Sequence, residues 1–147
     1  MAYIDFLPLT EVKNHLRIDA DFLDDDAALT RMVGSALQYI EMHTGHIFGE
    51  RTKTYRRNVY GFIDIIDYPV TYAGDLVRMD YAGKVRFDAD ELTLTVGYAS
   101  RNLVPDGLID AALMMIDAWY YSEDKRSDIT QIPMGAWQLI HTYKRNV

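Results

Sequence analysis

Apolar residues in the first third of the chain return every three or four positions, which is the spacing of a helix that buries one face. A short helix is predicted over Leu9–Ile18, directly after Pro8. A longer helix is predicted from Asp24 to Gly45, because three aspartates open this stretch and a glycine closes it. Asp24 and Gly45 are therefore the predicted caps. The apolar stripe of the long helix consists of Leu29, Met32, Val33, Ala36, Leu37 and Ile40.

The middle of the chain, residues 51–99, changes to a pattern typical of strands. Residues 52–60 favour a first strand, which Gly61 ends before a second apolar run over 62–66. Residues 76–81 and 85–87 flank Ala82-Gly83-Lys84 and are predicted to form a hairpin. The segment 91–98 alternates strictly, which predicts a half-buried strand. Its buried face would carry Leu92, Leu94, Val96 and Tyr98.

The last third returns to helical spacing. A helix is predicted from Pro105 and Asp106 to about Tyr121, followed by a polar loop over 122–131 and a short helix over 135–142 after Pro133. The predicted fold is therefore α+β and mainly α. Two N-terminal and two C-terminal helices form a bundle, and a small antiparallel sheet or hairpin is inserted between them. The sequence has no internal repeat or long linker, so residues 1–147 are interpreted as a single domain.

Composition narrows the classes of function. The 147 residues include no cysteine, which excludes disulfides and thiolate metal sites. The net charge of −7 argues against a general affinity for nucleic acid, which needs clustered lysine and arginine. We expect a soluble, intracellular protein, because no signal peptide and no apolar run of about 20 residues is present.

One decapeptide, residues 51–60, departs from this acidic balance. It contains four bases and no acid. As a solvated edge strand, its charges would prevent unwanted strand pairing, and this is the commoner use of such residues. As a functional patch, it would meet an acidic partner or DNA phosphates. Both alternatives stay open at this point. The four bases are Arg51, Lys53, Arg56 and Arg57.

Candidate chemistry is sparse. Asp19, Asp21 and the aspartates at 24–26 resemble a calcium loop, but the fifth and sixth positions of that pattern hold Leu23 and Asp24 instead of an oxygen ligand and glycine. Their interpretation is helix capping. His43 and His46 lie at the end of the long helix. Histidine at this position interacts favourably with the negative end of the helix dipole, so no metal is needed to explain it. No phosphate loop, nucleophile elbow or carboxylate pair is found, so no catalytic residue, metal or cofactor is predicted.

Aromatic side chains are abundant and include eleven tyrosines. Tyrosine and tryptophan are favoured in protein–protein contacts, where a large apolar ring carries a polar tip. Trp137 and Tyr143, on the short last helix, are predicted to lie at an interface. Core packing is the first interpretation for Leu139, which the same helix carries.

The order of these motifs resembles the head–tail connector proteins of long-tailed double-stranded-DNA phages. The resemblance begins with Leu9-Thr10-Glu11-Val12-Lys13-Asn14-His15-Leu16-Arg17-Ile18-Asp19 and the helix ending Tyr39-Ile40-Glu41-Met42-His43-Thr44-Gly45. It continues through Tyr68-Pro69-Val70, Thr95-Val96-Gly97-Tyr98, the helix after Val104-Pro105 and Trp119-Tyr120-Tyr121. It closes on the segment 134–145, with Tyr143 and Arg145 in a terminal Tyr-x-Arg. The segment Ser122-Glu123-Asp124 departs from the family, in which Asn and Arg are common there.

This resemblance implies a non-enzymatic virion protein at the head–tail junction, made in the host cytoplasm. Such proteins form a ring, typically twelve-fold, beneath the portal, and they receive the tail or its stopper. Genomic DNA passes through the central channel without sequence-specific binding, and no membrane is involved. We expect the last helix to contact a neighbouring copy or the portal, and residues 51–60 to project toward a partner or the channel. The contact residues expected on the last helix are Trp137, Leu139, Tyr143 and Arg145. The alternative is a small regulatory nucleic-acid-binding domain that uses residues 51–60.

Overall fold

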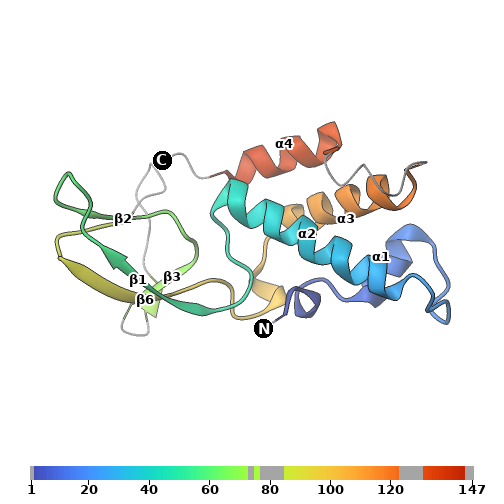
Figure 1. Ribbon diagram of the computed structural model, residues 1–147, viewed down its shortest axis with the longest axis horizontal. Helices are drawn as coiled ribbons and strands as arrows, with labels where there is room; N and C mark the ends of the chain where they lie inside the picture. Colours follow the sequence, from blue (N-terminus) through green and yellow to red (C-terminus); the bar gives the residue numbers. More distant parts are fainter. Residues whose placement is uncertain (1, 73–74, 77–84, 123–130, 145–147) are drawn as a thin grey trace.

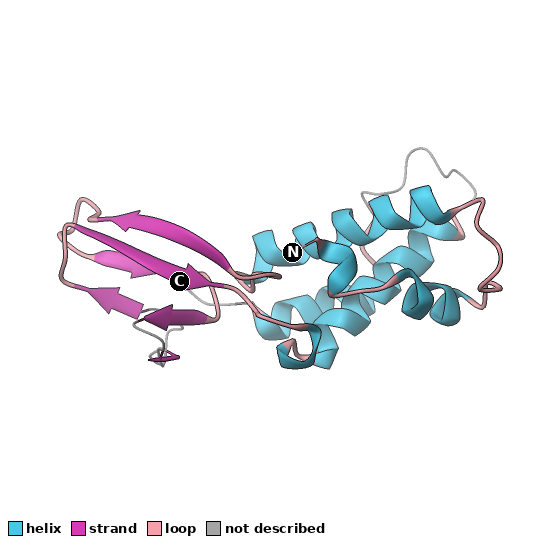
Figure 2. Ribbon diagram, turned by 90° about the horizontal axis from the view of Figure 1, so that it is seen from below, coloured by secondary structure: helices cyan, strands magenta, loops and turns pink. Residues whose placement is uncertain are grey.

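The computed structural model describes residues 2–72, 75–76, 85–122 and 131–144. A body of helices and a smaller β-structure lie end to end, so that the molecule is elongated (Figures 1 and 2). The helices are η1 (Tyr3–Asp5, 3-10), α1 (Leu9–Leu16), α2 (Asp26–Thr44), η2 (Arg101–Leu103, 3-10), α3 (Asp106–Tyr120) and α4 (Met134–Tyr143). The strands are β1 (Arg51–Arg56), β2 (Ile63–Ile65), β3 (Val70–Tyr72), β4 (Asp75–Leu76), β5 (Val85–Phe87) and β6 (Glu91–Val96). The predicted α+β class, mainly α with an inserted sheet, is confirmed.

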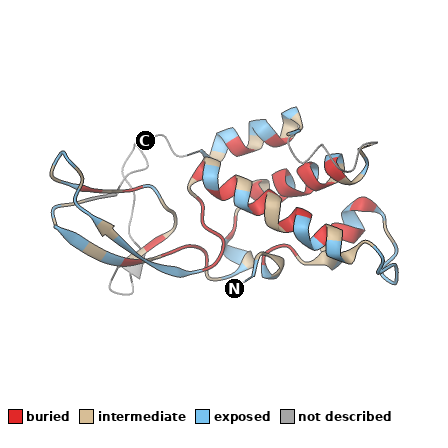
Figure 3. Cartoon of the chain, in the orientation of Figure 1, coloured by how far each residue is buried: buried red, intermediate tan, exposed pale blue. Residues whose placement is uncertain are grey.

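The helical body has one hydrophobic core, and the helices turn their buried faces toward it (Figure 3). On α2 the predicted stripe is buried throughout. α3 packs against α1, α2 and α4, and its buried side chains fill the centre. They are Leu108, Ile109, Ala111, Ala112, Leu113, Met115, Ile116 and Trp119. Burial of each large aliphatic side chain contributes about 1.5–3 kcal/mol. The helical periodicity of the sequence therefore identified the core of this body correctly.

The helix ends follow local chemistry, with one correction. Gly45 adopts φ 79° and its N–H bonds to the carbonyl of Glu41, which confirms it as the end of α2. The prediction that Asp24 caps α2 is wrong, because the capping position is held by Asp25, whose side chain makes no capping hydrogen bond. The aspartates have other partners. Asp25 accepts a hydrogen bond from the Tyr120 hydroxyl at 2.6 Å, and Asp26 pairs with the buried Lys13 ammonium at 2.6 Å.

The strands form a four-stranded antiparallel sheet in the order β1-β6-β3-β4 and a two-stranded ribbon of β2 and β5. The alternation predicted for 91–98 is confirmed, since Leu94, Val96 and Tyr98 are buried and Leu92 is half-buried. The first strand ends at Arg56, four residues before its predicted end. The predicted hairpin is wrong where the structure describes it, because Val85–Phe87 pairs with Ile63–Ile65. Residues 77–84 lie outside the described residues.

The two parts meet at a waist, formed by residues 45–51, 67–69 and 97–99. Aromatic rings fill it: His46 lies 5.1 Å from Tyr68 and 5.9 Å from Tyr98 between ring centroids, and its Nδ1 lies 2.7 Å from the Tyr98 hydroxyl. Phe48 and Tyr98 belong to the core of the helical body. A separate small core holds the β-structure together and contains Ile63, Ile65, Val70, Leu94 and Val96. The waist therefore joins two separately packed cores.

Candidate interaction surfaces

The basic segment predicted from residues 51–60 lies on β1, at one edge of the four-stranded sheet. Each of its four bases has an acidic partner. The nitrogen–oxygen distances are 2.8 Å for Arg51–Glu41, 2.7 Å for Lys53–Asp67, 3.2 Å for Arg56–Glu91 and 2.8 Å for Arg57–Asp90. These pairs compensate the positive charge of the segment. A charged edge strand fits this arrangement better than a surface for phosphates.

The acids that pair with these bases come from distant segments, so sequence spacing alone did not reveal them. Asp67 accepts hydrogen bonds from both Lys53 and Tyr55, at 2.7 and 2.5 Å. Lys53 and Tyr55 are two residues apart on β1, so their side chains lie on the same face of the strand. Burial, and to a smaller extent the hydrogen bond to Asp67, raises the pKa of Tyr55 far above its usual value. Tyr55 therefore stays a neutral donor.

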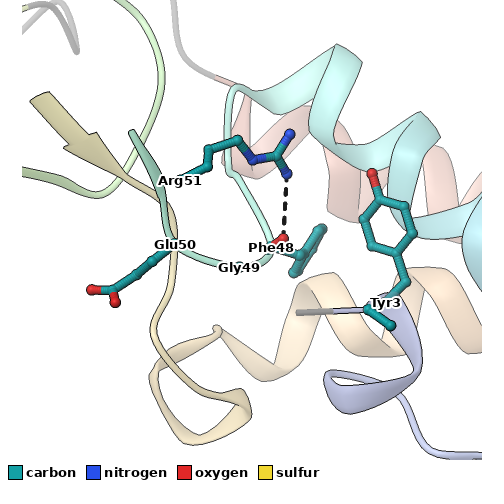
Figure 4. Close-up of a pocket in the computed structure, with 6 residues that line it drawn as sticks. Tyr3, Phe48, Gly49, Glu50 and Arg51 are labelled. Atoms are coloured by element: carbon teal, nitrogen blue, oxygen red, sulfur yellow. Dashed lines mark hydrogen bonds between the residues drawn. The ribbon is translucent and has the colours of Figure 1, made fainter. Parts of the chain in front are cut away.

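Glu41 is the polar centre of the waist. One carboxylate oxygen accepts from the Phe48 N–H and from Arg51, each at 2.8 Å, and the other accepts from the Tyr3 hydroxyl at 2.9 Å. Burial and this bond to Glu41 raise the pKa of Tyr3. Figure 4 shows the guanidinium of Arg51 turned back toward the helices, and the carboxylate of Glu50 pointing away. A recess of about 450 Å³ lies here, lined by Ala2, Tyr3, Phe48, Gly49, Glu50 and Arg51.

The two histidines at the end of α2 have different partners. His43 Nδ1 lies 3.0 Å from the carbonyl of Tyr39, and its ring stacks on the Tyr39 ring at 4.0 Å. His46 turns into the waist toward Tyr98. Within the described residues, no group of three His, Cys, Asp or Glu side chains is placed to hold a metal ion. In the same part of the chain, no helix has the length and apolarity needed to cross a membrane.

The predicted contact residues of the last helix differ in exposure. Trp137 is 40% exposed, and its ring lies 6.0 Å from His43 in an edge-to-face contact. Leu139 and Tyr143 are partly buried against the helical core, and the Tyr143 ring lies so close to Gly107 that a Cβ there would come within 2.7 Å of it. Arg145 lies outside the described residues. The interface role of these residues stays a prediction, and Trp137 is the most accessible of the described three.

Two further surfaces carry features that the sequence did not reveal, although residues 51–60 were expected to project toward a partner or the channel. The first is the turn between β1 and β2, which we call the tip (residues 57–62); it lies at the end of the molecule farthest from the helices (Figure 1). Val59 and Tyr60 are 94% and 82% exposed there. The sequence signal that was available was the pair of turn residues Asn58 and Gly61, which flank two apolar residues.

The second surface is a recess of about 460 Å³ on the waist, which we call the waist groove. Its apolar lining includes Met42, which is 77% exposed, together with Ile47 and Ile66. Its polar lining includes Arg51, Lys53, Lys144, Glu41 and Asp67. Because α2, β1 and Lys144, directly after α4, all contribute to this groove, local sequence patterns did not indicate it.

Comparison with known proteins identifies a family. Residues 7–144 match the family model described as phage gp6-like head-tail connector protein. No curated protein matches the chain. A chain in the virion of a native gene transfer agent (GTA) particle is 22% identical over 97% of this chain and 90% of its own, with a TM-score of 0.71.

Two chains from GTA necks have a similar fold. One, in the neck of an empty GTA particle computed with C6 symmetry, is 22% identical over 100% of this chain and 93% of its own, with a TM-score of 0.71. Another, in the neck of a native GTA particle computed with C12 symmetry, is 20% identical over 97% and 90%, with a TM-score of 0.64. At these identities the likeness shows a common fold.

Proposed function

Because this chain belongs to the phage gp6-like head–tail connector family, we propose that it is a virion structural protein that forms a ring between the capsid portal and the tail. The family match over residues 7–144 is the observation that carries this proposal. The likeness to chains of GTA necks, one computed with C12 symmetry, supports a ring of twelve copies. The central channel of the ring lets genomic DNA pass.

The shape of the subunit suits this role. A closed ring needs two different patches on each subunit, because each neighbour contacts a different side. Accessible apolar side chains occur at separate places on this molecule, including Trp137 on α4 and Tyr60 at the tip. The protein acts through assembly rather than catalysis. Its net charge of −7 favours passage of DNA without sequence-specific binding.

The partners of the ring are the portal on one side and the tail or its stopper on the other. The C-terminal segment contacts a neighbouring copy or the portal. The contact residues are Trp137, Leu139 and Tyr143 on α4, together with Arg145. The edge strand β1 and the residue after it face a partner or the channel, through Arg51, Lys53, Arg56 and Arg57. Their ion pairs keep that face close to neutral. Contact with a partner there depends on shape more than on charge.

Electron microscopy of particles with and without the gene for this chain tests the proposal. We expect wild-type particles to carry a twelve-fold density of this chain at the head–tail junction. Particles that lack it should accumulate as filled heads without tails. A chain that is absent from virions, and that does not associate with the portal, would overturn the proposal.

The nucleic-acid-binding alternative has less support, because each of the four bases on β1 and at its end is paired with an acid. It predicts binding to a short duplex that weakens steeply with salt. A binding titration at two salt concentrations distinguishes the alternatives. Salt-sensitive binding that the double variant Arg56→Gln, Arg57→Gln abolishes would favour the alternative.

A further inference from the structure

The tip presents two apolar side chains that are nearly free of intramolecular cover. Val59 is 94% exposed and Tyr60 is 82% exposed. Tyrosine combines a large contact area with little loss of conformational entropy, which makes it a common anchor in protein interfaces. An exposed apolar pair at the far end of a subunit therefore marks a docking element.

The tip is held in one conformation before any partner arrives. The side-chain oxygen of Asn58 accepts hydrogen bonds from the N–H groups of Tyr60 and Phe62, at 2.9 and 3.2 Å. Arg57 donates to the carbonyl of Gly61 at 2.7 Å, and Gly61 adopts φ 87°, which favours glycine. A preformed loop loses little entropy on binding, which favours affinity.

The waist groove offers a matching receptor in the same chain. Its volume of about 460 Å³ falls within the range of small-ligand sites. The groove therefore has room for an aromatic ring. Met42 and Ile66 supply exposed apolar lining, at 77% and 41% exposure. Met42 is also flexible, so it can adapt to an incoming ring.

Charge complements this match. Beside the tip, acids outnumber bases, since Asp88, Asp90 and Glu91 face Arg56 and Arg57. In the waist groove, bases outnumber acids among the lining residues. These bases are Arg51, Lys53 and Lys144, and the acids are Glu41 and Asp67. Most of these charges are paired with one another, so the excess is one acid beside the tip and one base in the groove. This difference adds a small electrostatic attraction to a contact made mainly by shape.

We propose that the tip of one copy inserts Tyr60 and Val59 into the waist groove of the next copy in the ring. This inference rests on the proposed ring and assigns the contact that closes it. The contact is heterologous, because tip and groove are different parts of one chain, so each copy both gives and receives.

The geometry of a ring adds a constraint. Equivalent atoms of all copies lie at the same height along the ring axis, so a tip can reach its neighbour's groove when both lie at one height. The tip lies at the end of the β-structure that is far from the helices (Figure 1). The groove is lined by residues at the end of α2 and the start of β1, so the two are separated along the long axis of the molecule. The long axis of each subunit is therefore inclined toward its neighbour and does not run parallel to the channel.

Crosslinking in assembled particles tests the contact, and the absence of natural cysteines gives a clean background. The double variant Tyr60→Cys, Met42→Cys is treated with a short bis-maleimide reagent. We expect a ladder of linked chains that extends beyond the dimer, because every copy joins two neighbours. The matched control is Tyr60→Cys, Met134→Cys, since Met134 on α4 is 71% exposed but lies outside the groove.

Equal crosslinking at Met42 and Met134, or at neither, overturns the contact. A second variant, Val59→Asn, Tyr60→Asn, leaves the folded core untouched and should lower incorporation into particles on the order of 30-fold, the loss expected for an aromatic anchor. Leu103→Asn, at another exposed apolar position, is its control and should change nothing. If the tip variant still forms a twelve-fold neck, the contact is overturned and the ring stands. If wild type forms no neck, the ring itself fails.

Discussion

Glu41, on the last turn of α2, accepts a hydrogen bond at 2.8 Å from Arg51, the first residue of β1. The same carboxylate accepts from the Phe48 N–H and the Tyr3 hydroxyl, so it joins the N-terminus, the long helix and the sheet. Its side chain is 8% exposed, whereas that of Arg51 is 43% exposed. This carboxylate therefore acts with the packed rings of the waist to fix how the β-structure sits on the helical body.

Replacing Glu41 by alanine is expected to lower the free energy of unfolding by about 2–3 kcal/mol, as measured by urea denaturation. The loss is smaller than for a fully buried pair because the guanidinium of Arg51 keeps contact with water. The matched control is Glu91→Ala, since both partners of the Arg56–Glu91 pair are exposed and the cost there is below about 1 kcal/mol. Equal losses for the two variants would contradict the special role of Glu41.

Two glycines allow a test in which the same substitution has opposite effects. Gly97 adopts φ 106°, and a Cβ there would come within 2.3 Å of the Gly49 carbonyl oxygen. Gly97→Ala is expected to destabilise the protein by about 3 kcal/mol through strain and overpacking. Gly34 lies inside α2 with room for a Cβ, so Gly34→Ala is expected to stabilise by about 0.5–1 kcal/mol. Thermal unfolding of both variants measures whether each substitution raises or lowers stability. A Gly97→Ala protein as stable as the wild type would contradict the close approach at the waist.

The helices could be predicted from the sequence because the residues that specify each helix lie within it or directly beside it. The stripe of α2, the proline before α3 and Gly45 each act within a few residues. Asp24 was assigned wrongly because three consecutive aspartates offer the same capping chemistry, and the choice among them depends on Lys13 and Tyr120, which lie elsewhere in the chain.

Strand pairing could be predicted less well, because partners are chosen by contacts between distant segments. Val85–Phe87 pairs with Ile63–Ile65 across the small core, although the turn-like sequence at 82–84 favoured a local hairpin. The basic segment was found in the sequence, but the acids that neutralise it were not. Residues 51–60 were expected to project, but the exposed apolar pair at the tip and the waist groove were not predicted, since exposure and recesses are properties of the assembled fold.

A pH effect is expected at Tyr120, whose hydroxyl donates to Asp25 at 2.6 Å. This bond, with a smaller contribution from burial, raises the pKa of Tyr120 to about 12. A raised pKa means that the contribution of this bond to stability is complete below the unfolded value of about 10 and is lost as the pH rises through about 12. Asp25→Asn should return the pKa toward 10, as followed by an NMR titration of the Tyr120 ring. Asp24→Asn, at a neighbouring exposed carboxylate, should leave the pKa unchanged.

A substitution of Trp137 is expected to affect assembly into particles without a large effect on the stability of the subunit. The Trp137 ring is 40% exposed on α4, so Trp137→Ala should change the free energy of unfolding by less than about 1 kcal/mol. If α4 contacts a neighbour or the portal, the same variant should lower incorporation into particles about tenfold, as measured by quantitative mass spectrometry of purified virions. Leu139→Ala, at another proposed contact residue of α4, gives the comparison for stability. Leu139 packs partly against the core, so its loss should cost about 1–2 kcal/mol, less than for a fully buried leucine. Normal incorporation of the Trp137 variant would exclude Trp137 from the interface and leave the proposed contact to Leu139, Tyr143 and Arg145.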